Sequence, residues 1–194
     1  MEEQGVGSDQ KKTRRLGAHL AFVDESGFLL IPTVRRTWAP KGKTPLLRHS
    51  YRRDRISTIS ALTVSPRRAR LGLYVQFHRK NISGVEVLRF LRGLKRHLRG
   101  PIVVVWDGGS IHYKQLVRDY VGRLGSRLYV YRFPGYAPEL NPAEYVWTNA
   151  KRRLSNGTPE DIDRLGADLQ VAIRRIARSQ RLLRACLRRS TLSF

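Results

Sequence analysis

Six short apolar runs in this chain have the length and the β-branched or aromatic content that is typical of strands. They are His19–Val23, Phe28–Ile31, Ile56–Val64, Leu71–Phe77, Ile102–Trp106 and Leu128–Phe133. Ser26-Gly27 is a turn signal between the first two runs, so we expect them to form a hairpin with Asp24 near its tip. The run IVVVW is apolar without a break, which favours a strand that is buried on both faces.

Helical periodicity and capping signals mark four further segments. They are Ser83–Leu98, a stretch from about Ile111 to Leu124, a helix that begins at Asn141, and a last helix that begins at Thr158. Ser83 and Glu86 have the spacing of a capping box. Thr158 and Pro159 suit the N-cap and the first position of the last helix. Residues 34–51 predict an irregular basic loop.

The order of these elements predicts a mixed α/β sheet that is flanked by helices. An antiparallel meander comes first, and alternating helices and strands follow it. This order matches an RNase H-like arrangement, in which Asp24 and Asp107 would come from neighbouring central strands. We expect residues 1–17 to form a disordered polar segment. Residues 18–194 are expected to form one domain with a basic C-terminal helix.

The chain carries a large excess of positive charge, since 38 Lys and Arg residues against 15 Asp and Glu residues give a formal net charge of +23. This balance favours nucleic acid as a partner, although ribosome-associated and other soluble basic proteins share it. The single cysteine, Cys186, excludes a disulfide framework and a thiolate zinc cluster within one chain. No apolar run has the length of a membrane span. The expected location is the cytoplasm, in association with the nucleoid.

Two aspartates stand where strands would present them to a common point. Asp24 follows the first apolar run, and the alternative interpretation is a carboxylate that stabilises a turn. Its neighbour Glu25 is a second candidate that would point to the other face of the strand. Asp107 ends the unbroken apolar strand, where α/β sheets bind ligands, and the two glycines after it leave space beside its carboxylate. The alternative for Asp107 is an Asx turn that opens the next helix.

Glu144 lies at the third position of a helix that Asn141 would cap and Pro142 would begin. A glutamate there suits a capping box, and the same geometry aims it from a rigid helix start. His112, five residues after Asp107, is placed to contact a phosphate or to orient a carboxylate, or it is a packed or solvated histidine. Asn141 and His112 are therefore supporting candidates. Three carboxylates suffice to hold two Mg²⁺ ions about 3.5–4 Å apart for phosphoryl transfer.

The strings FVDESG, VVWDGGSIH and PGYAPELNPAEYVW resemble the three acidic motifs of DDE transposases, and most closely those of the mariner superfamily in its bacterial insertion-sequence branch. The third motif is the most specific, and 36 residues separate Asp107 from Glu144. The resemblance covers Ala18–Arg153. It implies an RNase H-like fold, a catalytic and metal-binding triad of Asp24, Asp107 and Glu144, and cleavage and strand transfer at element ends with Mg²⁺ or Mn²⁺, as two ions.

The same resemblance implies partners. Double-stranded DNA would supply the element ends and the target, joined at TA dinucleotides, and a homodimer would pair two ends. Full-length relatives carry N-terminal helix-turn-helix domains that read the ends, whereas about 17 polar residues precede the first strand here. We therefore expect an upstream-encoded helix-turn-helix protein to supply that reading. The alternatives are a non-enzymatic or domesticated DNA-binding remnant and a structure-selective nuclease of the same fold.

Candidate DNA-binding residues form two basic groups. Around the second strand lie Arg35, Arg36, Trp38, Lys41, Lys43, Arg52 and Arg53, and on the last helix lie Arg174, Arg175 and Arg178. Cations of this kind bind phosphates without reading the sequence. An aromatic ring among them is suited to stacking on exposed bases. The alternative for Trp38 is a local core anchor.

Overall fold

The computed structural model describes residues 16–31, 33–47, 53–67, 70–135 and 137–190. In these ranges the chain forms a five-stranded sheet in the order β3-β2-β1-β4-β5. The strands are β1 (His19–Leu29), β2 (Arg55–Val64), β3 (Leu71–His78), β4 (Ile102–Trp106) and β5 (Leu128–Arg132). Antiparallel pairs join β1, β2 and β3, whereas β4 is parallel to both β1 and β5. The predicted mixed α/β sheet is confirmed.

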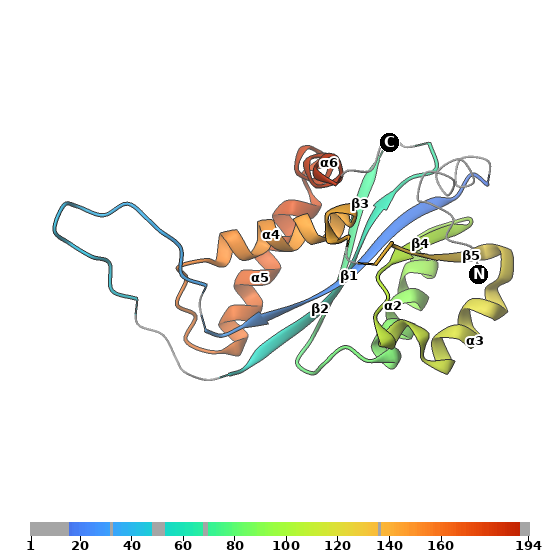
Figure 1. Cartoon of the computed structure of the whole chain (residues 1–194), viewed down its shortest axis with the longest axis horizontal. Helices are drawn as coiled ribbons and strands as arrows, with labels where there is room; N and C mark the ends of the chain where they lie inside the picture. The colour runs from blue at the N-terminus through green and yellow to red at the C-terminus, as the bar shows by residue number, and fades with distance from the viewer. Residues whose placement is uncertain (1–15, 32, 48–52, 68–69, 136, 191–194) are drawn as a thin grey trace.

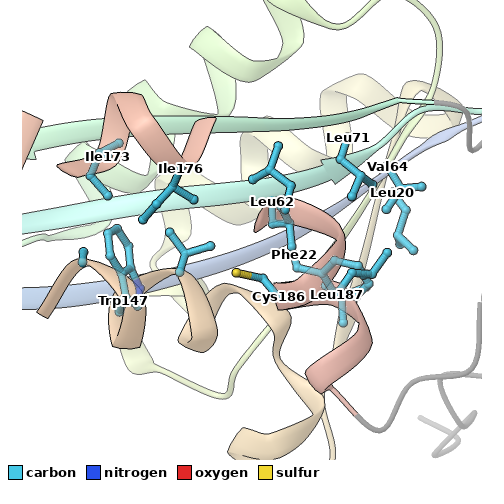
Figure 2. Close-up of a cluster of buried hydrophobic side chains, with 14 of the residues drawn as sticks. Leu20, Phe22, Leu62, Val64, Leu71, Trp147, Ile173, Ile176, Cys186 and Leu187 are labelled. Carbon is cyan, nitrogen blue, oxygen red and sulfur yellow. The ribbon is translucent and has the colours of Figure 1, made fainter. Parts of the chain in front are cut away.

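Helices cover both faces of this sheet (Figure 1). The described residues form α2 (Gly84–His97), α3 (Gln115–Leu124), α4 (Pro142–Leu154), α5 (Ile162–Ala177) and α6 (Gln180–Arg189), with short 3₁₀ turns η1 (Ser110–Tyr113), η2 (Gly125–Arg127) and η3 (Pro138–Leu140). Side chains of α2 and α3 pack with Val104 and Trp106, while those of α4, α5 and α6 pack with Phe22 and Val105. Figure 2 shows part of the core between the sheet and helices α4, α5 and α6, in which Trp147 lies beside Ile173 and Ile176. Both faces of the central strands are therefore buried.

Strand β1 is continuous, so the predicted hairpin is wrong. Its pairing with β2 runs without a break from Leu20–Val64 to Leu29–Arg55. The hydroxyl of Thr58 also donates to the carbonyl of Ser26 at 2.8 Å, in the middle of the expected turn. This ladder of cross-strand bonds outweighs the local turn preference of Ser-Gly, because strand propensity depends on context. Asp24 consequently lies in the interior of a strand and not at a hairpin tip.

Two of the predicted helix starts are confirmed. Ser83 and Glu86 form the reciprocal capping box of α2. The Asn141 side chain accepts the backbone N–H of Ala143 at 3.1 Å, and Pro142 occupies the first turn of α4. The sequence therefore predicted the start of the helix that carries Glu144.

The predicted last helix is corrected in two respects. Its cap is Asp161 and not Thr158, because the Asp161 carboxylate accepts the backbone N–H of Arg164 at 2.7 Å. The segment also divides into α5 and α6, with Ser179 capping the second helix. Upstream, the stretch that predicted a helix from Ile111 divides in the same way, into η1 and α3.

Residues 1–15 lie outside the described part of the chain, so the boundary between a polar segment and a domain at residue 18 stays a prediction. Among the helices that the structure describes, none is both long enough and apolar enough to cross a lipid bilayer.

Candidate active site

Asp24, Asp107 and Glu144 line one pocket of about 380 Å³. Phe22 of β1 is paired with Val105 of the parallel strand β4. Asp24 and Asp107 each follow two residues after this pair, so they lie next to each other. Asn141 donates from its amide to the carbonyl of Val23 at 3.3 Å, which ties the start of α4 to β1 and brings Glu144 to the same pocket. Hollows of about 710 and 960 Å³ lie at the start of α5 and beside β3, but neither brings together carboxylates from distant parts of the chain. The pocket of about 380 Å³ is therefore the candidate site.

Asp24 is buried within this pocket, at 6% exposure, and its Oδ2 has no hydrogen-bond partner in the part of the chain that the structure describes. Burial, together with the negative charges of Glu144, Glu25 and Asp107, raises the pKa of Asp24 to about 8. The nearby indole N–H of Trp147 acts to lower that pKa, although its geometry falls short of a complete hydrogen bond. In the metal-free protein, Asp24 is consequently protonated at neutral pH.

Asp107 is ionised, in contrast to Asp24. Its Oδ1 accepts the backbone N–H of Gly109 at 2.8 Å and lies 3.2 Å from Nδ1 of His112. The bond to His112 lowers the pKa of Asp107, against the effect of burial, and Gly109 and Arg132 act in the same direction as His112. The Asx turn that the sequence offered as an alternative is present, and it leaves Asp107 on the pocket wall.

The two glycines after Asp107 provide space, as predicted. A Cβ at Gly108 would lie 2.3 Å from Nη2 of Arg132, and one at Gly109 would lie 3.0 Å from Oδ1 of Asp107. Neither glycine has a positive φ, so their role here is the absence of a side chain. Arg132 was missed by the sequence analysis, and it is the only cation among the described residues that line the pocket. Its place at the end of the strand next to β4 is the signal that would have identified it.

Glu144 lies in the first turn of α4, on the solvent side of the pocket. The Asn141 side chain caps the helix through Ala143, and within the described chain no reciprocal bond from Glu144 completes a capping box. The capping-box interpretation of Glu144 is therefore wrong. Its carboxylate is free to face the other two acids.

His112 connects Asp107 with Glu25 behind the pocket. Glu25 points to the opposite face of β1 from Asp24, as predicted, and its Oε1 lies 3.0 Å from Nε2 of His112. His112 is 2% exposed as a residue, and its imidazole stacks on Trp106 at a centroid distance of 4.3 Å. Burial alone would lower the pKa of His112, but its bonds to Asp107 and Glu25 outweigh burial and raise the pKa to about 9. His112 is thus packed and charged at neutral pH.

The basic candidates lie outside the pocket. Arg35, Arg36, Trp38, Lys41 and Lys43 are exposed on the loop between β1 and β2, which extends away from the helices in Figure 1. Trp38 is 100% exposed, so its interpretation as a core anchor is wrong. Arg53 is also exposed, and Arg52 lies outside the described residues. Arg174, Arg175 and Arg178 are exposed at the end of α5, where Arg178 is the C-cap.

Two sets of groups in the site have the chemistry to hold a divalent cation. The first is Asp24, Asp107 and Glu144, an all-oxygen set of the kind that Mg²⁺ and Mn²⁺ prefer. The mutual repulsion of these carboxylates, which contributes to the raised pKa of Asp24, would be relieved by a cation in the pocket. The second is Glu25, Asp107 and His112, with one ligand atom each within 4.8 Å of the others. Both ring nitrogens of His112 already have carboxylate partners, so the first set fits better.

Comparison with solved structures identifies the same fold in transposases. The chain superimposes on the Mos1 strand transfer complex with a TM-score of 0.59 and 16% identity, covering 96% of this chain and 59% of that one. The Mos1 mariner paired end complex with Mn gives 0.60 and 15%, covering 96% and 60%. The catalytic domain of Mos1 mariner transposase gives 0.52 and 13%, covering 100% and 98%. The chain thus spans about three fifths of the longer Mos1 chains and nearly all of their catalytic domain.

A search of curated protein sequences found no match to this chain. A family model described as DDE superfamily endonuclease matches residues 19–166, which include all five strands and the three acids of the pocket. Because this match extends over most of the chain, the protein belongs to the DDE superfamily of endonucleases.

Proposed function

We propose that this chain is the catalytic domain of a DNA transposase of the mariner superfamily, in its bacterial insertion-sequence branch. The observation that carries the proposal is the convergence of Asp24, Asp107 and Glu144, from β1, β4 and α4, on one pocket. The proposed substrate is double-stranded DNA, at the element ends and at the target. We further propose that the protein acts in the cytoplasm on the nucleoid, as a homodimer, with a helix-turn-helix module of the same or another chain reading the ends.

The proposed roles of the residues follow from their placement. Asp24, Asp107 and Glu144 would hold Mg²⁺ or Mn²⁺, as two ions, which would activate the attacking oxygen and stabilise the leaving one. Asn141 fixes the helix start that aims Glu144. His112 holds the Asp107 carboxylate in place. Arg132, on the pocket wall, is placed to contact a phosphate of the DNA backbone.

Asp107→Asn is expected to abolish metal-dependent cleavage, with a loss of at least about a hundredfold, because a divalent ion supplies several kcal/mol of charge stabilisation in phosphoryl transfer. The assay follows nicking and joining of labelled duplex DNA that carries the element ends, with Mg²⁺, Mn²⁺ or EDTA. Glu139→Gln is the matched control, since Glu139 is an exposed acid three residues before Pro142 that does not line the pocket. Unchanged cleavage by folded Asp107→Asn would rule out the proposed triad.

The same assay separates the alternatives. DNA binding by the wild type without cleavage in either metal would favour a non-enzymatic remnant. Cleavage without joining would favour a structure-selective nuclease of the same fold.

Neutralising the exposed loop is expected to reduce the salt dependence of DNA binding. The variant replaces Arg36, Lys41 and Lys43 with Ala, and leaves Arg35, whose backbone is bonded to Asn156 at 2.7 and 3.0 Å. If all three cations contact phosphates, the slope of log K against log salt concentration falls by about 2.7, at 0.9 for each contact. Fluorescence anisotropy between 50 and 300 mM KCl, roughly the range over which such slopes are resolved, provides the measurement.

The matched control for the loop variant removes the same charge from α3 and the turn after it. It replaces Arg118, Arg123 and Arg127, which are exposed on and after α3, with Ala. Equal slopes for the two triple variants would show that the loop makes no particular contribution to phosphate binding.

A further inference from the structure

Three buried polar atoms that have no hydrogen-bond partner among the described residues lie on one face of the sheet, around Asp24. They are Oδ2 of Asp24, Oγ of Ser60 and Nε1 of Trp147. Ser60 is directly opposite Asp24 in the β1–β2 pair and is 0% exposed. Side chains directly opposite in an antiparallel pair have Cβ atoms about 4.5–5.5 Å apart. An unsatisfied buried polar group costs about 1–3 kcal/mol, so three at one place call for an explanation.

Trp147 reaches this place because α4 crosses β1. The helix is tied to Val23 by the Asn141 amide, and further along, the rings of Trp147 and Phe28 pack edge to face at 5.9 Å. Asp24 lies in β1 between these two contacts, and the influence of the Trp147 N–H on its carboxyl group shows that the two are close. Trp147 is 1% exposed, so its N–H does not face bulk solvent.

We propose that Ser60 and Trp147 are positioning residues, which hold the fully buried oxygen of Asp24 when this carboxylate binds a divalent cation. The proposal rests on the proposed function, since it requires the metal site of Asp24, Asp107 and Glu144. An indole N–H is a donor only, and a serine hydroxyl can rotate to donate, so both suit an ionised carboxylate. Such partners orient metal-ligating carboxylates, and their loss commonly lowers metal affinity 10–100-fold.

The first test compares metal affinity with metal-free stability in Trp147→Phe and Ser60→Ala. Ser60→Ala removes a hydroxyl with no partner among the described residues, so its midpoint of urea unfolding in EDTA should be equal to or above that of the wild type. Trp147→Phe also leaves a cavity, because Trp147 is 1% exposed, and should unfold at a lower urea concentration. Affinity for Mn²⁺ alone, measured by electron paramagnetic resonance of the free ion, should fall about tenfold or more. Ser57→Ala is the matched control, because Ser57 is buried on the opposite face of β2. Variants that bind Mn²⁺ as the wild type does would overturn the proposal.

The second test uses a signal that a purely structural role would not move. The chain has three tryptophans, and the Trp147 indole resonance is assigned by its loss in Trp147→Phe. On titration with Mg²⁺ this indole proton should shift downfield in the wild type and stay unmoved in Asp107→Asn. A wild-type resonance that does not respond, in protein that binds Mn²⁺, would overturn the proposal alone. Failure of the wild type to bind Mn²⁺ at all would overturn the proposed metal site and this inference with it.

Discussion

Asp24→Asn is expected to make the metal-free protein more stable and to remove its cleavage activity. The pKa of Asp24 is raised to about 8 by burial and by three neighbouring carboxylates. A group with a raised folded-state pKa contributes its full stability below its unfolded value, 3.8, and this contribution is lost as the pH rises through about 8. Asparagine removes the titration, so the variant should gain on the wild type across this pH range.

The size of the gain follows from linkage. If the pKa difference converted fully into stability, ionisable Asp24 would cost the wild type about 1.4 kcal/mol of unfolding free energy for each pH unit between its unfolded-state and folded-state pKa values. Relaxation of the pocket reduces this cost. We therefore expect Asp24→Asn to be more stable than the wild type by about 3 kcal/mol at pH 8 and by close to zero at pH 4. Urea unfolding in EDTA at pH 4, 6 and 8 measures the difference, on the order of 1–2 M in the midpoint at pH 8. Glu139→Gln, the control from the cleavage assay, should show no such trend. A variant that is less stable than the wild type at every pH would contradict the proposed environment of Asp24.

A divalent cation should reverse the order of stabilities. Ligands that bind only the folded state stabilise it in proportion to the logarithm of their concentration over Kd. The wild type should therefore gain stability with Mg²⁺, while Asp24→Asn, with one ligand fewer, gains less. Cleavage should fall about a thousandfold, since roughly 4 kcal/mol of transition-state stabilisation depends on the bound ion. A site that destabilises the fold until it is occupied is the expected compromise between stability and function.

The elements that the sequence predicted well are those whose signals are local. The capping box at Ser83 and the Asn141-Pro142 helix start depend on residues within one turn, and both are present. The unbroken run Ile102–Trp106 is a central strand with all five residues buried. Parallel pairing of this strand with β1 then places Asp24 and Asp107 as predicted. Local capping signals and the order of the strands were therefore sufficient to predict that the three acids converge.

The features that the sequence did not predict depend on register between distant segments. Ser26-Gly27 reads as a turn until Thr58 and the rest of β2 pair with it. Arg132 enters the site only because β5 lies next to β4. The contact of Glu25 with His112 joins residues 87 apart in sequence, and strand alternation alone indicated only that Glu25 faces away from Asp24. No local pattern encodes these contacts, so only the assembled sheet shows them.

The Glu25–His112 pair is expected to have a coupling energy of about 1–3 kcal/mol at pH 6, the range for residues in direct contact within a charged network. The side chain of His112 is 1% exposed and that of Glu25 is 19% exposed, so solvent screens the pair little. His112→Phe keeps an aromatic ring against Trp106 and removes the positive charge between two carboxylates. His112→Phe alone should destabilise the protein by about 2–3 kcal/mol. This is less than the cost of breaking a fully buried ion pair, because the side chain of Asp107 is 60% exposed.

A double-mutant cycle of Glu25→Gln and His112→Phe, measured by urea unfolding in EDTA, isolates this coupling. The exposed pair Arg164–Asp168, one helical turn apart, is the control and should couple by no more than about 0.5 kcal/mol. A coupling below that of the control at pH 6 would show that the contact contributes nothing to stability.

The pH dependence of the coupling distinguishes charge from packing. His112 has a folded-state pKa raised to about 9 from 6.5, so its contribution is complete below pH 6.5 and is lost as the pH rises through about 9. The coupling should therefore be present at pH 6 and small at pH 10. A coupling that persists at pH 10 would assign it to the shape of the ring against Trp106 and not to its charge. Loss of the coupling at high pH, together with retained cleavage by Glu25→Gln at neutral pH, would show that the charged Glu25–His112 contact supports the fold and that Glu25 is not needed for cleavage.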